Sequence, residues 1–515
     1  MRRTSAALTS AALLTSLAIT AAPGAAAAAT NTLTVTVIDR TGAKVRERVV
    51  ATNLGTKRTY DLIGSKAASL PRGTYVVTTL IREDGSVAQT VGARTVKVSG
   101  ASATTVDARK GRPVKVALDT PKGAATWVTA AICVAGQDWT GRAAAVTDPG
   151  HVYVVPNSSA NLRFAYMAEW SQGSEDQKGR RVVNSHVVAG STKGVPAGVN
   201  RTFATSKLAR LTTQVRTGAT RGRHTPTSLE NEAGGCLGTM RSQLWYDGGP
   251  VTLHTHVSPG KWQTEVRNED GSGIYGAYRR TRTMESGKTY SEAVFPAVFG
   301  PSGRIPVVNN KLLRFSAWEY FVSPAGYDNG GAAVVKLTKG GKVLKQQTRR
   351  TGAEFNYRMT SAGWYGLTVD AKRTSPGATY PGTLLSARTI SKFRFYANPN
   401  KGQHVPAHTV TIAPKHLDIT NSAAPGSTTK VEFTVRRQHS GFDVPLTRST
   451  VKSVIAYVSV DHGKTWKKAT LSKSGGKWVT SVKNPGSGYV SLRTKVTDTK
   501  GNSSETIVYR AYRIA

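Results

Sequence analysis

Acidic residues are scarce in this chain of 515 residues, which contains 30 Asp and Glu against 70 Lys and Arg. The formal net charge is +40, and the basic excess is spread along the sequence in small clusters such as Lys178–Arg181 and Lys464–Lys468. A charge of this size attracts polyanions and speeds their encounter at low salt. We expect an anionic polymer or acidic protein as the partner, although solubility alone is a simpler interpretation. No nucleic-acid-binding signature accompanies the charge, which argues against nucleic acid.

Long hydrophobic runs are absent except at the N-terminus. Met1-Arg2-Arg3 precedes an apolar run over Ala6–Ala22 and small residues over Ala25–Ala29. This order is typical of a secretory signal peptide, and the run is too short and too rich in alanine for a membrane span. We therefore expect residues 1–29 to be a signal peptide, the protein to be secreted and extracellular, and no segment to span a membrane.

Cysteine is rare, with Cys133 and Cys236 as the two copies. In an oxidising compartment such a pair most often forms a disulfide. This one would close a loop of about a hundred residues and stabilise it by roughly 3 to 5 kcal/mol. The alternative is a pair of buried thiols that act as small hydrophobic side chains.

Long helical patterns are nearly absent, while 51 Gly and 22 Pro interrupt the chain often. The best helix candidate, Ser206–Thr217, fits a strand equally well. These features predict an all-β protein. Because the chain is too long for one ordinary domain, we expect serial β-sandwich domains. After the signal peptide we divide the chain into four regions, 32–119, 121–298, 299–413 and 416–515. The second region holds both cysteines.

Local patterns characterise the first and last of these regions. In the first, Thr32–Asp39 alternates as a strand, and Leu70–Thr79 has an L-P-x-G-x-Y turn that enters another strand. This region resembles the transthyretin-like, carboxypeptidase-regulatory-like β-sandwich. In the last, strands with turn signals at roughly 8- to 12-residue spacing favour an immunoglobulin-like sandwich. Over Val490–Thr497 an apolar face alternates with a polar one that includes Ser491. In the third region, Leu312–Val322 is predicted to form one strand.

The segment Ser459–Trp466, SVDHGKTW, fits the Asp-box pattern that repeats in sialidase-type β-propellers. A propeller needs many copies at a period of roughly 40 to 50 residues, and this sequence has one. Asp461, His462 and Gly463 are turn residues between two strand patterns. We interpret the segment as a structural β-hairpin with Trp466 beside the turn, not as a catalytic element.

Several stretches resemble, in order, the region that follows the catalytic domain in large secreted subtilisin-like serine peptidases of bacteria. The most extensive is the ending GYVSLRTKVTDTKGNSSETIVYRAYRIA. The others are Val106–Val116, Ser206–Thr212, Gly260–Thr264, Val298–Ser302 and Leu417–Gly426. The resemblance implies that this chain is related to the accessory, non-catalytic β-domains of those peptidases.

The catalytic motifs of that family are missing. A subtilisin-like triad needs Asp in D-[ST]-G, His in H-G-T and Ser in G-T-S-M, and none of these occurs here. The nearest sequences are His462-Gly-Lys464 and Gly238-Thr-Met240, where Met stands in place of the Ser. No triad residue can be carried over, so we expect this chain not to be an enzyme.

Other catalytic or metal-binding patterns are weak. His254-Thr-His256 could place two imidazoles on one strand face, but no third ligand is evident, so we expect no metal and no cofactor. A glycan hydrolase would need a pair of carboxylates, but we favour solvated loop charges as the interpretation of the candidates. Those candidates are Asp138, Glu169, Glu175, Asp176, Glu230 and Glu232.

Tryptophans are concentrated in the two middle regions, where exposed rings could stack on sugars or peptide segments. The possible ligand-binding residues are Trp139, Trp170, Trp245 and Trp262, and Trp318 and Trp364 follow in the third region. For most of them we favour core packing as the interpretation.

These observations favour a secreted, non-catalytic, monomeric binding or adhesion protein for an anionic cell-wall polymer, polysaccharide or protein. The alternatives are an accessory partner or degenerate relative of a secreted subtilisin-like peptidase, and a glycan hydrolase with its site in region 121–298.

Overall fold

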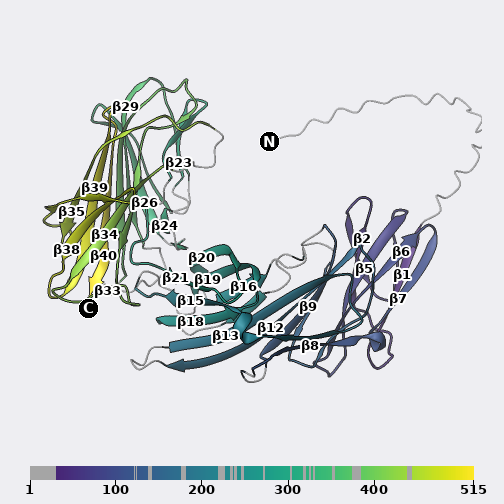
Figure 1. The fold of residues 1–515 in the computed structure, drawn as a ribbon. Helices are drawn as coiled ribbons and strands as arrows, with labels where there is room; N and C mark the ends of the chain where they lie inside the picture. The colour runs from purple at the N-terminus through teal and green to yellow at the C-terminus, as the bar shows by residue number, and fades with distance from the viewer. Residues whose placement is uncertain are drawn as a thin grey trace, which may run out of the picture.

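The computed structural model confirms an all-β chain (Figure 1). Among the described residues the helical elements are two 3-10 turns, η1 (Ala108–Lys110) and η2 (Thr205–Lys207). None of the helices there is long and apolar enough to cross a membrane. The predicted signal peptide lies outside the described residues. Those residues are 31–120, 122, 125–136, 142–175, 181–218, 227–231, 236, 241–244, 249–270, 273–301, 304–316, 320–323, 326–328, 331–350, 354–373, 384–437 and 444–515.

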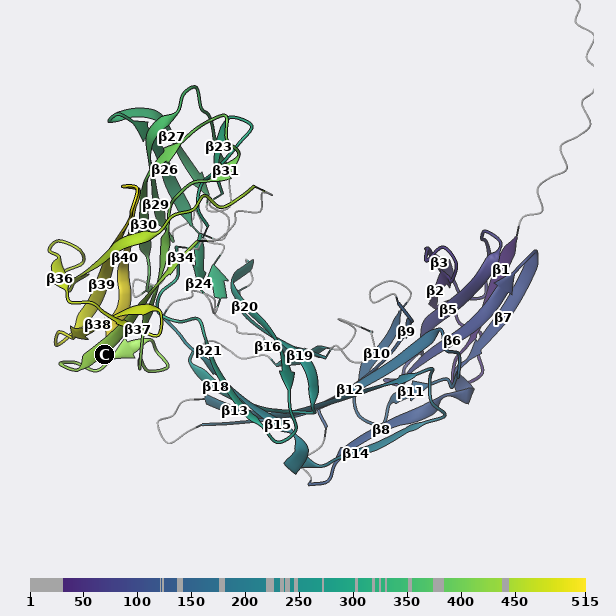
Figure 2. The same cartoon turned by 45° about the horizontal axis from the view of Figure 1, so that its top comes forward.

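The sheets follow one another along a curved, elongated molecule, with the first and last strands at opposite ends (Figures 1 and 2). At the N-terminal end, a three-stranded sheet faces a seven-stranded one across a core that includes Val35, Val77 and Val106. The small sheet has the order β4 (Ala67–Ser69), β1 (Thr32–Ile38) and β7 (Ala101–Asp107). The large one has the order β14 (Val199–Phe203), β8 (Arg112–Leu118), β11 (Val152–Val154), β6 (Gln89–Val98), β5 (Gly73–Arg82), β2 (Arg48–Asn53) and β3 (Thr59–Ile63). β11 and β14 come from the predicted second region, so this sheet draws on residues from both sides of position 120.

Two sheets form the middle of the molecule. The first has the order β10 (Ala143–Thr147), β9 (Trp127–Val134), β12 (Leu162–Glu175), β13 (Arg181–Lys193), β18 (Val251–Val257), β15 (Ala209–Val215) and β21 (Thr289–Val294). The second has the order β17 (Arg241–Leu244), β16 (Thr227–Asn231), β19 (Gly260–Asp270), β20 (Gly273–Met284), β25 (Gly326–Asp328) and β24 (Phe321–Ser323). Most of the ambiguous segment 206–217 is thus the strand β15, preceded by η2.

Three sheets build the C-terminal half. A nine-stranded sheet has the order β27 (Lys342–Arg350), β26 (Ala332–Lys339), β29 (Gly363–Lys372), β30 (Arg388–Ala397), β40 (Ser503–Ile514), β39 (Gly488–Asp498), β35 (Val451–Ser459) and β36 (Lys467–Ala469), with β33 (Ser422–Ala423) also paired to β40. Facing it are β28 (Glu354–Arg358), β23 (Leu312–Ser316), β22 (Val307–Asn309) and β31 (Gln403–His404). The last sheet is β32 (Thr409–Pro414), β34 (Thr428–Arg436), β38 (Lys477–Lys483) and β37 (Ser472–Ser474).

The last region has the strand arrangement of an immunoglobulin-like sandwich. β32-β34-β38-β37 corresponds to strands A, B, E and D, and β40-β39-β35-β36 to strands G, F, C and C′. Phe433 and Val482 from one sheet and Val454 and Leu492 from the other share one core. The serial β-sandwich architecture is therefore confirmed.

The nine-stranded sheet is continuous across residues 413–416, where the sequence suggested a boundary. β30 pairs antiparallel with β40 over seven residue pairs from Arg388↔Tyr509 to Arg394↔Ser503. Strand G of the immunoglobulin-like sandwich would otherwise have an open edge, and β30 covers it. The third and fourth regions consequently present one common outer sheet face.

Two details of the strand predictions were wrong. Leu312–Val322 is not one strand, because β23 and β24 belong to different sheets. Ser491, expected on the wet face of β39, is 0 % exposed. A register shift between Val490 and Leu492 turns it inward, and its hydroxyl accepts the Arg510 backbone N–H at 3.1 Å.

The predicted turn-to-strand segments share one contact. Tyr75, at the start of β5, donates its hydroxyl to the Pro71 carbonyl at 2.7 Å, and its ring is 0 % exposed. Tyr365 in β29 makes the same i to i−4 contact with the Ser361 carbonyl at 2.5 Å. Each tyrosine therefore ties the turn to the strand that it enters.

The Asp-box segment forms the predicted hairpin between β35 and β36. The Asp461 carboxylate accepts the Ser459 hydroxyl at 2.7 Å and the Thr465 backbone N–H at 3.0 Å. Gly463 has φ +83°, and a Cβ there would lie 2.5 Å from the Tyr509 ring, so glycine is required. The Trp466 ring lies edge-on to Tyr509. These hydrogen bonds hold the turn and account for the motif structurally.

Candidate functional site: an aromatic and basic sheet face

The outer face of the nine-stranded sheet carries aromatic and basic side chains from both C-terminal regions. In β30, Phe393 and Phe395 are buried, whereas Lys392, Arg394 and Tyr396 alternate with them and are exposed. Their cross-strand partners lie on the same side of the sheet, because directly paired residues face the same way. We call the following set the aromatic–basic face: Lys336, Trp364, Arg388, Lys392, Arg394, Tyr396, Tyr457, Arg493, Lys495 and Tyr509.

Guanidinium groups lie over aromatic rings at three places on this face. Arg394 is 4.0 Å from the centroid of Trp364, Arg388 is 5.4 Å from Tyr509, and Arg493 is 5.2 Å from Tyr457. Such cation–π contacts hold flexible arginines in defined positions. The face is therefore partly preorganised, with rings and cations at fixed spacing.

Trp364 and Tyr396 form an exposed aromatic pair. Their ring centroids are 5.9 Å apart at an angle of 78°, and they are 36 % and 48 % exposed. They occupy directly paired positions on β29 and β30. Arg394 also donates to the Gly501 carbonyl at 3.0 Å, which fixes the guanidinium beside the pair. Exposed rings of this kind can stack on a sugar ring or another planar group.

Two carboxylates on the face are already engaged by cations. Asp370 accepts two hydrogen bonds from Arg388, at 2.8 and 2.5 Å. Glu505 pairs with Lys392 at 2.9 Å and also with Arg493. Burial raises the pKa of Glu505, but these two cations outweigh it and hold the pKa below its ordinary value.

Positive charge remains after this pairing. Within the part of the chain that is described, no ion pair to a carboxylate involves Lys336, Arg394 or Lys495. The face can therefore offer stacking surfaces and uncompensated cations to one ligand. An extended anionic polymer with ring-shaped units has both complementary features.

Of the four tryptophans nominated from sequence, the two that the structure describes are buried. Trp170 and Trp262 are 5 % and 0 % exposed, and the Trp262 indole N–H donates to the Ser258 carbonyl at 2.7 Å. Both rings are in the core and leave no face open to a ligand. Trp139 and Trp245 lie outside the described residues. The exposed Trp364 was in the wider set of tryptophans, but no sequence pattern indicated that Arg394 and Tyr396 would flank it.

The acidic candidates of region 121–298 are partly described. Glu169 and Glu230 are 2 % and 8 % exposed, and Glu230 accepts a hydrogen bond from Gln263 at 2.8 Å. The favoured prediction of solvated loop charges was therefore wrong for these two residues, which are buried. The side chains of Asp138, Glu175, Asp176 and Glu232 lie outside the description.

Three histidines gather on the middle sheet. His186 of β13 and His256 of β18 are paired across the strands, and their rings stack with centroids 4.6 Å apart. The Nδ1 of His254 is 3.1 Å from the Thr212 hydroxyl. No group of three metal-ligating side chains occurs among the described residues. Burial first, and then His256 and Lys122, lower the pKa of His186 to about 4.

Cys133 and Cys236 form the predicted disulfide, with 103 residues of sequence separation. Both are fully buried in a cluster that includes Trp262 and Leu229. The bond thus ties β9 to the segment between β16 and β17.

Comparison with known proteins places the chain in no family. No family model and no curated protein matches it. Among solved structures, the FN1–FN3 domains of chicken CNTN1 match 57 % of this chain and 99 % of their own at 9 % identity, with a TM-score of 0.15. A putative membrane-anchored protein of Corynebacterium diphtheriae matches 76 % of this chain and 96 % of its own at 9 % identity and the same TM-score. Escherichia coli alpha-2-macroglobulin matches 95 % of this chain and 40 % of its own at 9 % identity, with a TM-score of 0.17. At these TM-scores the likenesses carry no argument about function.

Proposed function

We propose that this protein is a secreted, non-catalytic binding protein that attaches to an acidic polysaccharide through the aromatic–basic face. The observation that carries the proposal is the arrangement of Trp364, Arg394 and Tyr396, an exposed aromatic pair with a guanidinium fixed 4.0 Å from the indole centroid. Rings stack on sugar faces, and cations hold carboxylate or sulfate groups.

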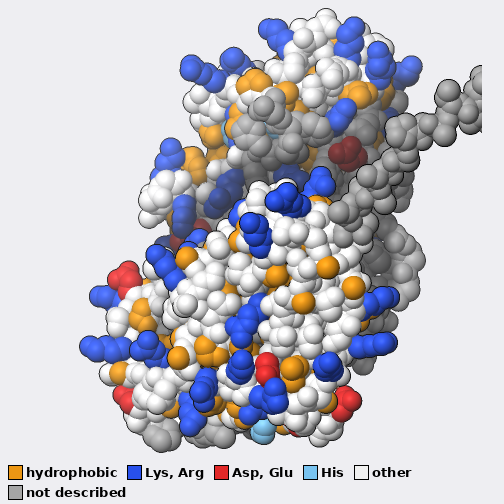
Figure 3. All heavy atoms as spheres, turned by 90° about the vertical axis from the view of Figure 1, so that its right-hand side faces the viewer, with side chains coloured by type: hydrophobic (Ala, Val, Ile, Leu, Met, Phe, Trp, Pro, Cys, Tyr) orange, Lys and Arg blue, Asp and Glu red, His pale blue; other side chains and the backbone are white. Residues whose placement is uncertain are grey.

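The overall charge supports the choice of an anionic ligand. The chain carries a formal charge of +40, and Figure 3 shows Lys and Arg scattered over the N-terminal end with few acidic side chains. This field would gather an anionic polymer from solution, whereas the aromatic–basic face would hold it. Continuous pairing of β30 with β40 makes the face a single rigid platform across two regions.

The alternative is an accessory role beside a separately encoded subtilisin-like peptidase. It rests on the sequence resemblance described above, and an acidic protein substrate would then replace the polysaccharide as ligand. Both roles are non-catalytic for this chain.

The test is retention of the purified protein on immobilised polygalacturonate, dextran and casein, from about 0.05 M to about 0.5 M salt. We expect salt-sensitive retention on polygalacturonate and none on dextran, with the polymer length unchanged. Retention on casein alone would favour the accessory role. Salt-independent retention, or release of shortened polymer, would contradict the proposal.

A further inference from the structure

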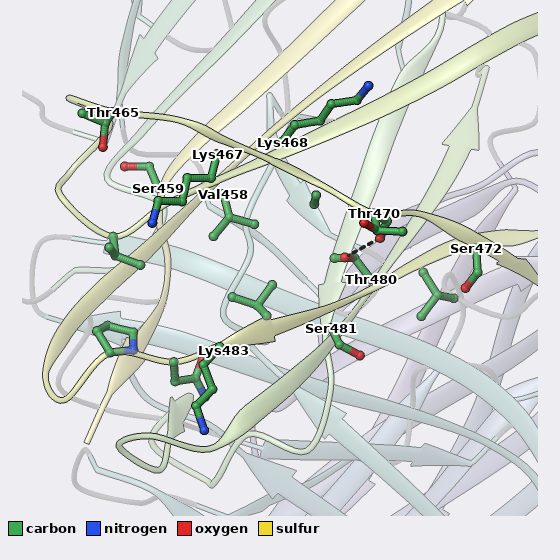
Figure 4. A pocket seen from close by; sticks show the side chains of 16 residues that line it. Val458, Ser459, Thr465, Lys467, Lys468, Thr470, Ser472, Thr480, Ser481 and Lys483 are labelled. Carbon is green, nitrogen blue, oxygen red and sulfur yellow. Dashed lines mark hydrogen bonds between the residues drawn. The ribbon is translucent and has the colours of Figure 1, made fainter.

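A hollow of about 760 Å³ opens between the two sheets of the immunoglobulin-like sandwich (Figure 4). One wall is the end of β35 with β36, and the other is β38 with the turn that follows it. This volume lies within the range of small-molecule sites. All of the lining residues are described.

The hollow exists because the sandwich is open along this edge. Among the described strands, β36 pairs with β35 only, and β37 covers β38 only over Lys477–Val479. The remainder of β38, Thr480–Lys483, has no strand on that side. The core-facing surfaces of both sheets therefore remain accessible here.

Strand register places a lysine on the core side of the hollow. Ala456 is 0 % exposed and pairs with Ala469, so Ala469 faces inward. By alternation Lys467, which pairs with Val458, faces inward too, whereas Lys468 faces outward. Figure 4 shows Lys468 extending away from the hollow. An exposed lysine thus occupies a strand position where a sandwich normally places an apolar side chain.

Two polar side chains of the opposite wall, those of Thr480 and Asn484, are bonded within the protein. The Thr480 hydroxyl donates to the Thr470 carbonyl at 2.7 Å, which links the two walls (Figure 4). The Asn484 side chain bonds the Ser427 hydroxyl and accepts from Tyr512, both at 2.9 Å. The apolar lining includes Val482, which is 4 % exposed.

The charged residues that line the hollow have one sign. Its lining contains Lys467, Lys468 and Lys483 and no acidic residue. In the described part of the chain, no ion pair to a carboxylate involves Lys467. The site therefore combines an apolar floor with a cation that has no internal counterion, which is complementary to an anionic head joined to an apolar body.

We propose that this hollow is a second binding site, for a small anionic amphiphile. The carboxylate head would pair with Lys467, with Lys483 at the mouth, and the apolar body would lie against Val458, Ala469 and Val482. This proposal is independent of the aromatic–basic face, because the ligand class and the sheet surface differ.

The test uses the full mature protein, with dodecanoate as the probe and dodecyltrimethylammonium as its cationic counterpart, in titration calorimetry. We expect saturable one-to-one dodecanoate binding. Lys467→Glu should weaken it by roughly tenfold or more, since a charge-assisted bond is lost, and should admit dodecyltrimethylammonium instead. The matched control is Lys464→Glu, three residues away in the hairpin turn and outside the lining of the hollow, which should change neither affinity appreciably. Lys464 and Lys467 are both exposed, so both variants should fold, as circular dichroism would verify.

Three results would overturn the proposal: no saturable dodecanoate binding, equal effects of Lys467→Glu and Lys464→Glu, or equal affinity for both probes. Binding of polyglutamate but not of dodecanoate, lost in Lys467→Glu, would also reject the amphiphile and assign the open strand edges to an acidic peptide instead.

Discussion

The guanidinium of Arg394 lies 4.0 Å from the ring centroid of Trp364, and a hydrogen bond to the Gly501 carbonyl keeps it there. Gly501 belongs to the turn between β39 and β40, whereas Trp364 belongs to β29 of the preceding region. The hydrogen bond that fixes the Arg394 guanidinium therefore depends on the pairing of β30 with β40. Strand pairing between the third and fourth regions thus helps to build the surface that we assign to ligand binding.

The exposed tryptophan of this face should contribute directly to polymer binding. Trp364→Ala should weaken the affinity for polygalacturonate by roughly five- to tenfold, because a stacking surface and the support of Arg394 are both lost. Affinity electrophoresis measures this effect. The matched control is Trp127→Ala, which removes a tryptophan that is 46 % exposed elsewhere. Equal losses in the two variants would show that general hydrophobic contact explains the binding.

The disulfide should stabilise the middle of the molecule. It closes a loop with a sequence separation of 103 residues, so its reduction should cost about 5 kcal/mol in the chain-entropy model. Guanidinium unfolding followed by tryptophan fluorescence, with and without dithiothreitol, would measure the loss. A double Cys133→Ala/Cys236→Ala variant should unfold at the same guanidinium midpoint as the reduced wild type, and dithiothreitol should not change that midpoint. An unchanged midpoint in the reduced wild type would contradict this prediction.

The stacked histidines should make the middle sheet sensitive to acid. The pKa of His186 is about 4 in the folded protein, against an ordinary value of 6.5, so the folded state binds fewer protons than the unfolded state. The contribution of neutral His186 to the free energy of unfolding is fully present above pH 6.5. It is lost as the pH falls towards 4, and the total loss is about 3 kcal/mol. His186→Phe should reduce this loss in pH-dependent thermal unfolding, whereas His151→Phe at an exposed position should not. Identical pH profiles for all three proteins would exclude the stacked pair as the cause.

The buried tyrosine at the start of β5 should stabilise the first sandwich. Tyr75→Phe removes the hydrogen bond to the Pro71 carbonyl and should cost about 1 kcal/mol. Tyr60→Phe is the control, because Tyr60 contacts the Tyr75 ring but makes no hydroxyl hydrogen bond within the described residues. Chemical unfolding of both variants would compare them. A Tyr60→Phe loss as large as that of Tyr75→Phe would attribute the effect to ring packing instead.

Local features of this fold were predictable from the sequence. Alternating apolar residues gave strands such as β1 and β39, and the L-P-x-G-x-Y and Asp-box segments gave turns whose hydrogen bonds are local. The disulfide was predictable because only two cysteines exist. Each of these inferences uses residues that are adjacent in sequence, or a choice with few alternatives.

The candidate site was not predictable, because it depends on long-range pairing. Nothing in the sequence around Arg388–Arg394 indicates that β40, more than a hundred residues later, will be its neighbour. Arg394, Tyr396 and Tyr509 therefore look like ordinary surface residues. The register shift that buries Ser491 was missed for a related reason, since simple alternation contains no signal for a bulge.

The most direct test compares a charge reversal on the aromatic–basic face with a charge reversal elsewhere on the molecule. We would measure the affinity of soluble polygalacturonate for the wild type, for Arg394→Glu and for Lys97→Glu, which reverses an exposed charge at the other end of the molecule. If the aromatic–basic face is the binding site, Arg394→Glu should lose roughly tenfold or more and Lys97→Glu far less. Equal losses would mean that the total charge holds the polymer and that the face has no special role.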